Sequence, residues 1–390
     1  MSASPDFLER LRRLMPGEAV HIGHSFIVLN VAGVRLALDP ATENGECAAP
    51  FSNLTLTART RLRSYRPLVE PAHIPPAERL AECVDVVLYS HTHADHFNAA
   101  VLAKMMAANP RLRVFWPAGT LRLLYAPRRR LSRVWSRLLA WLDTFTWADC
   151  VPAGLREFSD AAPPRLRLAN TRELADGQMV MLREAPRIEL HAFEVRHPRP
   201  LLWVRSPFEA ATPPVLGYEI VFEAEGARRR LLLVGETGAD PEVLHRIWAA
   251  GDELVGLFLP VDERLRLPII RALYEWYFHA SPHFLALAER LAGERATIHG
   301  LHHGLWLYAL KADDVALGRR LLQRLSRAPR ADAAEVGARL AESRAARNFG
   351  LTAMRRLESL IDAISRYPQR ATDKVRLNPL GQPFRFGQAG

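Results

Sequence analysis

The feature that most constrains this chain is a set of metal-ligand residue types placed directly after a short apolar run. The stretch "VDVVLYSHTHADHFNAA", residues 84–100, opens with a continuous apolar run that ends at Ser90. Such a run is typical of a strand buried on both faces, and the residues after it lie at the edge of a sheet, where α/β proteins commonly bind ligands. Three histidines and an aspartate follow within six positions: His91, His93, Asp95 and His96.

These four side chains are expected to bind metal ions. Imidazole nitrogens and carboxylate oxygens are the ligands of zinc and of related divalent ions. His91 and His93 are two positions apart in an extended segment, so they can point the same way and share one ion. Asp95 and His96 stand where the chain turns into a helix and can serve a second ion. Packing would explain a lone histidine, but four such residues in six positions indicate a metal motif.

Strands and helices are expected to alternate from residue 19 to about residue 310. Residues 19–39 read as two β-rich runs, and residues 40–76 form a loop-rich insertion. From residue 311 the pattern is helical and charged, and the end, "LNPLGQPFRFGQAG", looks irregular. We therefore expect a short N-terminal segment over 1–18, one α/β domain over 19–310, and a C-terminal helical extension with a tail over 311–390. Further strands are expected over 82–90, 113–117, 187–197, 215–223, 228–236, 254–260 and from 296, and helices over 98–110, 240–251 and 281–293.

Composition places the chain among globular proteins. Its 390 residues are 49% apolar and 24% charged, as in folded rather than disordered chains. No uninterrupted apolar run approaches the roughly twenty residues that a spanning helix needs. The N-terminus lacks the apolar core of a secretory signal, so we expect a cytoplasmic location. Cys47, Cys83 and Cys150 lie far apart and form neither a CxxC pair nor an even disulfide framework.

Arginine dominates the positive charge. The formal net charge is +10, but only three of the 52 basic residues are lysines, and the arginines are spread along the whole chain. The exception is the segment 121–147, in which leucines and tryptophans recur at helical spacing between arginines. Three interpretations of this segment stay open: a packed helix with a solvated basic face, which we place first, a helix on a membrane surface, and a lid over an anionic substrate. A nucleic-acid partner ranks below a peripheral membrane contact.

The motif "HTHADH" resembles the HxHxDH signature of the metallo-β-lactamase superfamily. The segment "HIGHSFIVLNVAGVRLALDP" is similar to the N-terminal hairpin of one branch of it, which includes the ascorbate-6-phosphate lactonases and N-acyl-phosphatidylethanolamine phospholipase D. Further segments resemble that branch in the same order, so the resemblance covers residues 19–307 and not the C-terminal helices. It implies a four-layer αβ/βα sandwich, with two mixed sheets face to face, helices outside, and the metal ions at one sheet edge.

The resemblance also implies the ligands of a first ion and the bridge to a second. The first ion takes His91, His93 and His197, the last of which follows a strand in "EVRHP". Glu236 in "LLLVGETG" stands where the family usually has an aspartate that bridges both ions. A glutamate is one methylene longer, so it still bridges but changes the spacing of the ions and the choice of metal.

Two residues of the motif and a histidine late in the sequence would bind the second ion. Asp95 and His96 come from the motif. For the late ligand His302 is preferred, because "HHGLW" has the His-x-Gly-x-aromatic form of the family segment. His299 is its main rival, and His303 is read as a neighbour.

Two close divalent ions imply a hydrolytic mechanism. They lower the pKa of a shared water, so that a metal-bridging hydroxide exists at neutral pH, and they polarise the substrate oxygen. Asp95 would orient this nucleophile or pass a proton, and His24 would reach the substrate or protonate the leaving group. Asp39 would hold a ligand histidine in its tautomer. The alternatives for these last two are a packed histidine and an aspartate that shapes the turn before Pro40.

The sequence therefore predicts a binuclear hydrolase with two divalent ions, zinc first and manganese or iron as alternatives. It would act on a small anionic substrate with an ester-type bond, a phosphodiester or a lactone. A di-iron redox enzyme of the oxygenase kind on the same fold is the second interpretation, because carboxylates such as Glu236 suit iron. A non-catalytic protein that binds lipid or nucleic acid through residues 121–147 is the third. The C-terminal helices either pack on the domain or form an oligomer contact.

Overall fold

The structure, a computed structural model, describes most of the predicted α/β domain and a short C-terminal stretch. The predicted C-terminal helices lie outside the described residues, and so does the basic segment 121–147 apart from Leu121. The described residues are 5–23, 25–40, 73–92, 96–97, 99–121, 166, 168–195, 213–237, 240–249, 251–260, 282–293, 296–301, 375–378 and 380–386.

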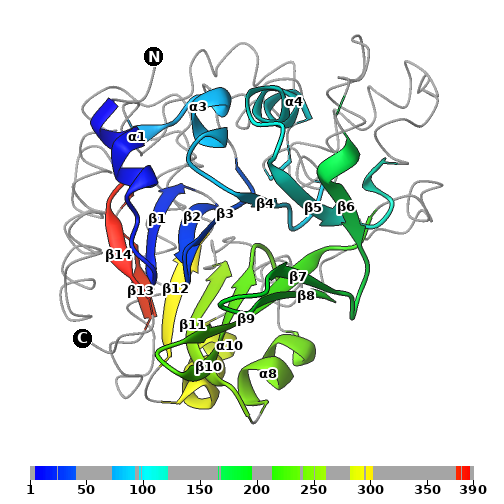
Figure 1. Ribbon diagram of the computed structural model, residues 1–390. Coiled ribbons are helices and arrows are strands. Elements are labelled where there is room, and N and C mark those ends of the chain that lie inside the picture. The colour runs from blue at the N-terminus through cyan, green and yellow to red at the C-terminus, as the bar shows by residue number, and fades with distance from the viewer. Residues whose placement is uncertain are drawn as a thin grey trace, which may run out of the picture.

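The first of two seven-stranded sheets has the strand order β14-β1-β2-β3-β4-β5-β6 (Figure 1). Its first four strands pair antiparallel, and β3 to β6 pair parallel. The carboxyl ends of the parallel strands therefore lie along one edge. The strands are β1 (Glu18–Gly23), β2 (Phe26–Val31), β3 (Val34–Leu38), β4 (Val86–Leu88), β5 (Arg113–Pro117), β6 (Thr171–Leu174) and β14 (Pro383–Arg385).

The second sheet has the order β13-β12-β11-β10-β9-β8-β7 and the same division into two halves. Here β13 to β10 pair parallel, and β10 to β7 pair antiparallel. The strands are β7 (Met179–Arg183), β8 (Ile188–Glu194), β9 (Leu216–Ala224), β10 (Ala227–Val234), β11 (Glu253–Pro260), β12 (Thr297–Leu301) and β13 (Val375–Leu377).

Helices cover the outer face of each sheet, and the two sheets face each other between them (Figure 1). On the first sheet lie α1 (Pro5–Arg12), α3 (Ala77–Ala81) and α4 (Ala99–Ala108), and on the second lie α8 (Pro241–Trp248) and α10 (Pro282–Ala292). A 3-10 turn, η4 (Leu168–Asn170), precedes β6. This is the predicted αβ/βα sandwich.

The apolar runs of the sequence are explained by strands that are buried on both faces. In β2, Phe26 and Val28 pack in the core beneath α1, α3 and α4, whereas Ile27 and Leu29 pack in the core between the sheets. All four side chains are fully buried. A strand between two cores has no polar face, so its sequence does not alternate.

The structure corrects two predictions, one near each end of the chain. Residues 19–39 form three strands rather than two, because the chain also turns between β1 and β2. The end of the chain, expected to be irregular, adds β13 to the edge of one sheet and β14 to the edge of the other. Between these strands the Gly381 N–H donates to the carbonyl oxygen of His21 at 2.8 Å. Strands of three residues carry too little periodicity to be recognised from sequence.

Helix α8 begins as its sequence predicts. Asp240 is the N-cap, its carboxylate accepts a hydrogen bond from the Glu242 N–H at 2.8 Å, and Pro241 occupies the first helical position. Among the described residues, no helix has both the length and the apolar character needed to cross a membrane.

Candidate metal centre

The candidate centre lies where strands of both sheets end. Asp39 follows the last residue of β3 directly, and His91 comes three residues after the end of β4, its parallel neighbour. Glu236 comes two residues after the end of β10 in the facing sheet, not at the strand end itself as predicted. The topology thus brings three chain segments of distant sequence position to one place.

Three of the predicted ligands converge there. Ligand atoms of His91, His96 and Glu236 all lie within 4.8 Å of one another. Nε2 of His91 is 2.8 Å from Oε2 of Glu236, and Nε2 of His96 is 3.7 Å from the same oxygen. The two imidazole rings are 4.0 Å apart between centroids. The residues are 1%, 1% and 3% exposed, so bulk water contributes little to their solvation.

Asp39 makes the predicted contact with a ligand histidine. Its Oδ2 lies 2.8 Å from Nδ1 of His96, and both side chains are buried. An ionised carboxylate only accepts, so the Nδ1 of His96 carries the hydrogen, and in the neutral ring Nε2 then holds the lone pair that faces Glu236. The backbone of Asp39 has φ +44°, in the left-handed region that aspartate tolerates better than most residues. Unusual backbone conformations of this kind collect at functional sites.

Ser90 is a member of the centre that the sequence reasoning missed. Its N–H donates to Oδ1 of Asp39 at 2.7 Å, and its hydroxyl lies 2.6 Å from Oδ2 of the same carboxylate. The hydroxyl oxygen is also 2.8 Å from Nδ1 of His91. The signal for this residue was its position, since it stands between the buried strand and the first histidine of the motif.

Gly235 lets the second sheet approach this network. A Cβ atom at position 235 would lie 2.7 Å from Oδ2 of Asp39 and 2.7 Å from Oγ of Ser90, closer than carbon and oxygen atoms can come. The hydroxyl of Ser25 donates to the carbonyl oxygen of Gly235 at 3.1 Å and so connects the β1–β2 turn to the same peptide. The glycine beside Glu236 therefore has a steric reason, which the "VGET" pattern alone does not reveal.

Strand β9 supports the loop that carries the histidines. The Leu216 N–H donates to the carbonyl oxygen of Ser90 at 2.8 Å, and the hydroxyl of Tyr218 donates to the carbonyl oxygen of Tyr89 at 2.7 Å. Burial, together with the negative charge of Asp39, raises the pKa of Tyr218 well above its ordinary value, so it remains a neutral donor. Both sheets thus hold the segment after β4.

His299 lies in a different environment from the cluster. Its Nε2 is 2.8 Å from Oγ1 of Thr297, its Nδ1 is 2.8 Å from Oδ1 of Asn378, and its ring stacks on Phe258 at 4.8 Å. Both ring nitrogens are engaged with neighbouring polar groups, as in a packed core histidine. These contacts favour a packing role for His299, and the choice of the last ligand stays a prediction.

The other predicted site residues stay predictions because they lie outside the described residues. They are His24, His93, Asp95, His197, His302 and its neighbour His303. In the sequence, His302 comes directly after Leu301, the last residue of β12.

The donor set that is described fits a divalent ion. With Nδ1 of His91 and of His96 facing oxygen acceptors, the two Nε2 atoms direct lone pairs at a carboxylate oxygen. At 2.8 Å the Nε2 of His91 and Oε2 of Glu236 would repel each other unless a cation or a proton lies between them. Two imidazoles and a carboxylate are the mixed nitrogen and oxygen set that zinc, manganese and iron accept.

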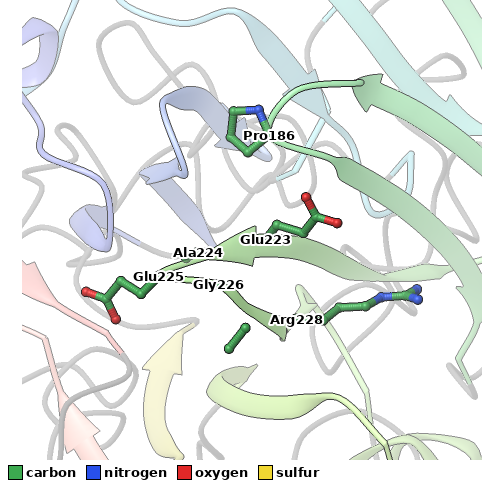
Figure 2. Close-up of a pocket in the computed structure, with 7 residues that line it drawn as sticks. Pro186, Glu223, Ala224, Glu225, Gly226 and Arg228 are labelled. Carbon is green, nitrogen blue, oxygen red and sulfur yellow. The ribbon is translucent and has the colours of Figure 1, made fainter.

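A surface hollow away from the metal centre does not bring ligand side chains together. It lies at the turn between β9 and β10, and in Figure 2 the side chains of Glu223, Glu225 and Arg228 extend away from one another. None of the clustered histidines lines it. The hollow gives no reason to place chemistry there.

No family model matches the chain, and no curated protein matches it either. Solved structures similar to it include an isothiocyanate hydrolase from Delia radicum gut bacteria, with 16% identity, a TM-score of 0.48, and coverage of 95% of this chain and 99% of that one. Unliganded yeast PDE1 has 13% identity, a TM-score of 0.48, and coverage of 95% and 100%. A possible metal-dependent hydrolase from Veillonella parvula has 14% identity, a TM-score of 0.45, and coverage of 77% and 91%. Likeness at these identities concerns the fold alone.

The αβ/βα sandwich that the resemblance implied is confirmed by the two facing mixed sheets with helices outside. The lactonase and phospholipase-D-like branch stays a prediction.

Proposed function

We propose that this protein is a metal-dependent hydrolase with two divalent ions. The observation that carries the proposal is the convergence of two imidazole Nε2 atoms and one carboxylate oxygen within 4.8 Å, in a buried place. A structural ion pair rarely requires two histidines that both carry their hydrogen on Nδ1, away from the carboxylate. A metal site does need that arrangement.

The ions would be held by residues from both sheets. His91, with the predicted ligands His93 and His197, would serve one ion. His96, with Asp95 and His302, would serve the other. Glu236 lies within reach of Nε2 of both described histidines, at 2.8 and 3.7 Å, as a bridging carboxylate requires.

Bound divalent ions lower the pKa of a water and polarise a carbonyl or phosphoryl oxygen. The chain supplies the rest of the chemistry. Burial of the centre excludes bulk water, which strengthens each electrostatic interaction inside it. Asp95 is proposed to orient the nucleophile or to accept its proton, and His24 to protonate the leaving group.

For the substrate we propose a small anionic molecule with a phosphodiester or lactone bond. The support is the branch resemblance of the N-terminal hairpin and the arginine- and tryptophan-rich segment 121–147. The same fold hosts unrelated reactions, so the substrate class has to come from the site and from assays rather than from architecture.

The first experiment measures zinc, manganese and iron in the purified protein and after reconstitution. About two zinc or manganese ions per chain are expected. The reconstituted protein is then assayed on a bis-aryl phosphodiester and on a panel of lactones. Absence of bound metal after reconstitution would contradict the proposal.

Paired histidine variants locate the activity. His96→Ala is expected to lose metal and hydrolysis together. His245→Ala is the matched control, because His245 is exposed on α8 and lies outside the cluster. Metal content and activity in His96→Ala equal to those of the control would contradict the assignment of the site.

A di-iron redox enzyme is the second candidate, and Glu236 is the observation that favours it. A glutamate within reach of both clustered histidines adds a carboxylate to the centre, and carboxylate-rich sites suit iron. About two irons per chain, with an absorbance band that fades on reduction, would support this candidate over the hydrolase.

A further inference from the structure

We propose that Ser90 is a positioning residue that links Asp39 to His91 and thereby sets the affinity of one of the two metal sites without setting that of the other. This inference rests on the proposed binuclear function. It assigns a role to a residue that is neither a metal ligand nor in contact with a substrate in the mechanism above.

The hydrogen bonds of the Ser90 hydroxyl have only one consistent direction. A hydroxyl has a single hydrogen to donate. Its oxygen is 2.6 Å from Oδ2 of Asp39, which as a carboxylate must accept, so the hydrogen points to Asp39. The oxygen of Ser90 then accepts from Nδ1–H of His91 at 2.8 Å. In the neutral ring the lone pair of His91 is then on Nε2, which faces Glu236.

Asp39 thus reaches the two ligand histidines by different routes. Its Oδ2 accepts directly from Nδ1 of His96 at 2.8 Å. It reaches His91 only through the hydroxyl of Ser90. One carboxylate therefore orients both rings, but only the route to His91 contains a side chain that can be removed without touching the carboxylate.

The position of Ser90 leaves its hydroxyl little freedom. Its N–H donates to Oδ1 of Asp39, and its carbonyl oxygen accepts from the Leu216 N–H at 2.8 Å. The residue is 0% exposed, and a Cβ atom at position 235 would lie only 2.7 Å from its Oγ.

Ser90→Ala is therefore expected to affect one site selectively. It leaves Nδ1–H of His91 without its acceptor, so the ring loses its preferred tautomer and orientation. Removal of a hydrogen-bond partner of a metal ligand typically lowers metal affinity by about 10- to 100-fold. Because Asp39 still contacts His96, affinity at the other site is expected to fall by a clearly smaller factor.

The test is a zinc titration against a competing chelator, which resolves the affinities of the two sites in the full-length protein. Ser90→Thr retains the hydroxyl and is expected to hold zinc more tightly than Ser90→Ala does. Thr120→Ala is the matched control, because Thr120 is also a fully buried hydroxyl and donates to the carbonyl oxygen of Pro117 at 2.6 Å, outside the cluster. It should change neither zinc affinity.

The outcomes separate this inference from the proposed function. Failure of the wild type to bind two zinc ions would overturn the function itself. Two zinc ions in the wild type and unchanged affinities in Ser90→Ala would overturn only the role of Ser90. An equal loss at both sites, or a loss in Ser90→Thr as large as in Ser90→Ala, would also overturn it.

A measurement on the wild type remains decisive if Ser90→Ala does not fold. In the zinc-loaded protein with ¹⁵N-labelled histidine, the inference requires the hydrogen of His91 on Nδ1 and protected from exchange. A hydrogen on Nε2 of His91, or coordination of zinc through its Nδ1, would overturn the proposal without any variant.

Discussion

Oδ2 of Asp39 lies 2.8 Å from Nδ1 of His96, although the two residues are 57 positions apart in the chain. Asp39 directly follows β3, and His96 lies between β4 and α4. The contact therefore joins the ends of two neighbouring strands of the first sheet. The same carboxylate also takes both donors of Ser90. Asp39 is therefore the common support of both described histidines of the centre.

Asp39→Asn is expected to lower metal affinity at both proposed sites by about 10- to 100-fold. The amide replaces one accepting oxygen with a donor, so it cannot accept from His96, from the Ser90 hydroxyl and from the Ser90 N–H together. Chelator competition measures the loss. Asp85→Asn is the control, since Asp85 is exposed and accepts from the Arg35 N–H at 2.9 Å on the same sheet. A loss confined to one site would contradict the central role of Asp39.

Gly235→Ala is expected to disrupt the centre and to lower the free energy of unfolding by about 1–3 kcal/mol, as overpacking of a buried place does. The new methyl group would meet Asp39 and Ser90 at 2.7 Å, and both are fixed by their own hydrogen bonds. Urea unfolding and zinc titration are measured on the same protein.

Gly256→Ala is the control for that substitution. Its Cβ would lie 2.7 Å from Cδ1 of Leu231, the end of an apolar side chain in the same sheet. This substitution should lower the free energy of unfolding and leave zinc affinity unchanged. Equal zinc affinity in Gly235→Ala and the wild type would show that the close approach is unimportant for the metal centre.

His299→Gln is expected to retain both ions and to lower the free energy of unfolding by about 1–3 kcal/mol, the cost of disturbing buried hydrogen bonds. The reason is that the ring nitrogens of His299 lie 2.8 Å from Thr297 and from Asn378, not in the cluster. Metal analysis and urea unfolding check the two halves of the prediction. Loss of one ion would favour His299 over His302 as the last ligand.

The sequence predicted the parts of the centre whose signals are local. The buried run before His91 and the ligand types within the motif placed a metal site after β4, and His91 and His96 indeed lie together with Glu236. The contact of Asp39 with a ligand histidine was also predicted, although only as one of two interpretations. The inference for the two histidines used adjacent residues and the rule that ligands bind at strand ends, whereas the place of Glu236 came from the family resemblance.

What the sequence did not reveal depends on contacts between distant segments. The role of Gly235 follows from the approach of β10 to the first sheet, and that distance is visible only once both sheets are folded. The edge strands β13 and β14 exist because β12 and β1 offer them partners. The contact of His299 with Asn378, a residue 79 positions away, is likewise invisible in the sequence. Tertiary context decides such cases.

Glu189→Gln is expected to destabilise the protein at neutral pH and to lose its effect in acid. Glu189 is a buried carboxylate on β8 that accepts hydrogen bonds from Arg187 at 2.5 Å, His191 at 3.1 Å and Arg228 at 3.2 Å. Burial alone would raise the pKa of Glu189, but the hydrogen bonds from His191 and Arg187 and the charges of Arg187 and Arg228 bring it below its ordinary value. Charged hydrogen bonds of this kind contribute about 1.5–3 kcal/mol.

The sign of the pH dependence follows from that lowered pKa. The unfolded chain takes up a proton at Glu189 at a higher pH than the folded protein does, so stability is fully present above the ordinary glutamate pKa and falls as the pH drops through the lower folded value. Urea unfolding of the wild type and of Glu189→Gln should therefore differ most near neutral pH and converge in acid. Glu223→Gln, an exposed position on the neighbouring β9, should follow the wild type throughout. A stability difference for Glu189→Gln that is constant with pH would show that its carboxylate acts through packing rather than through its charge.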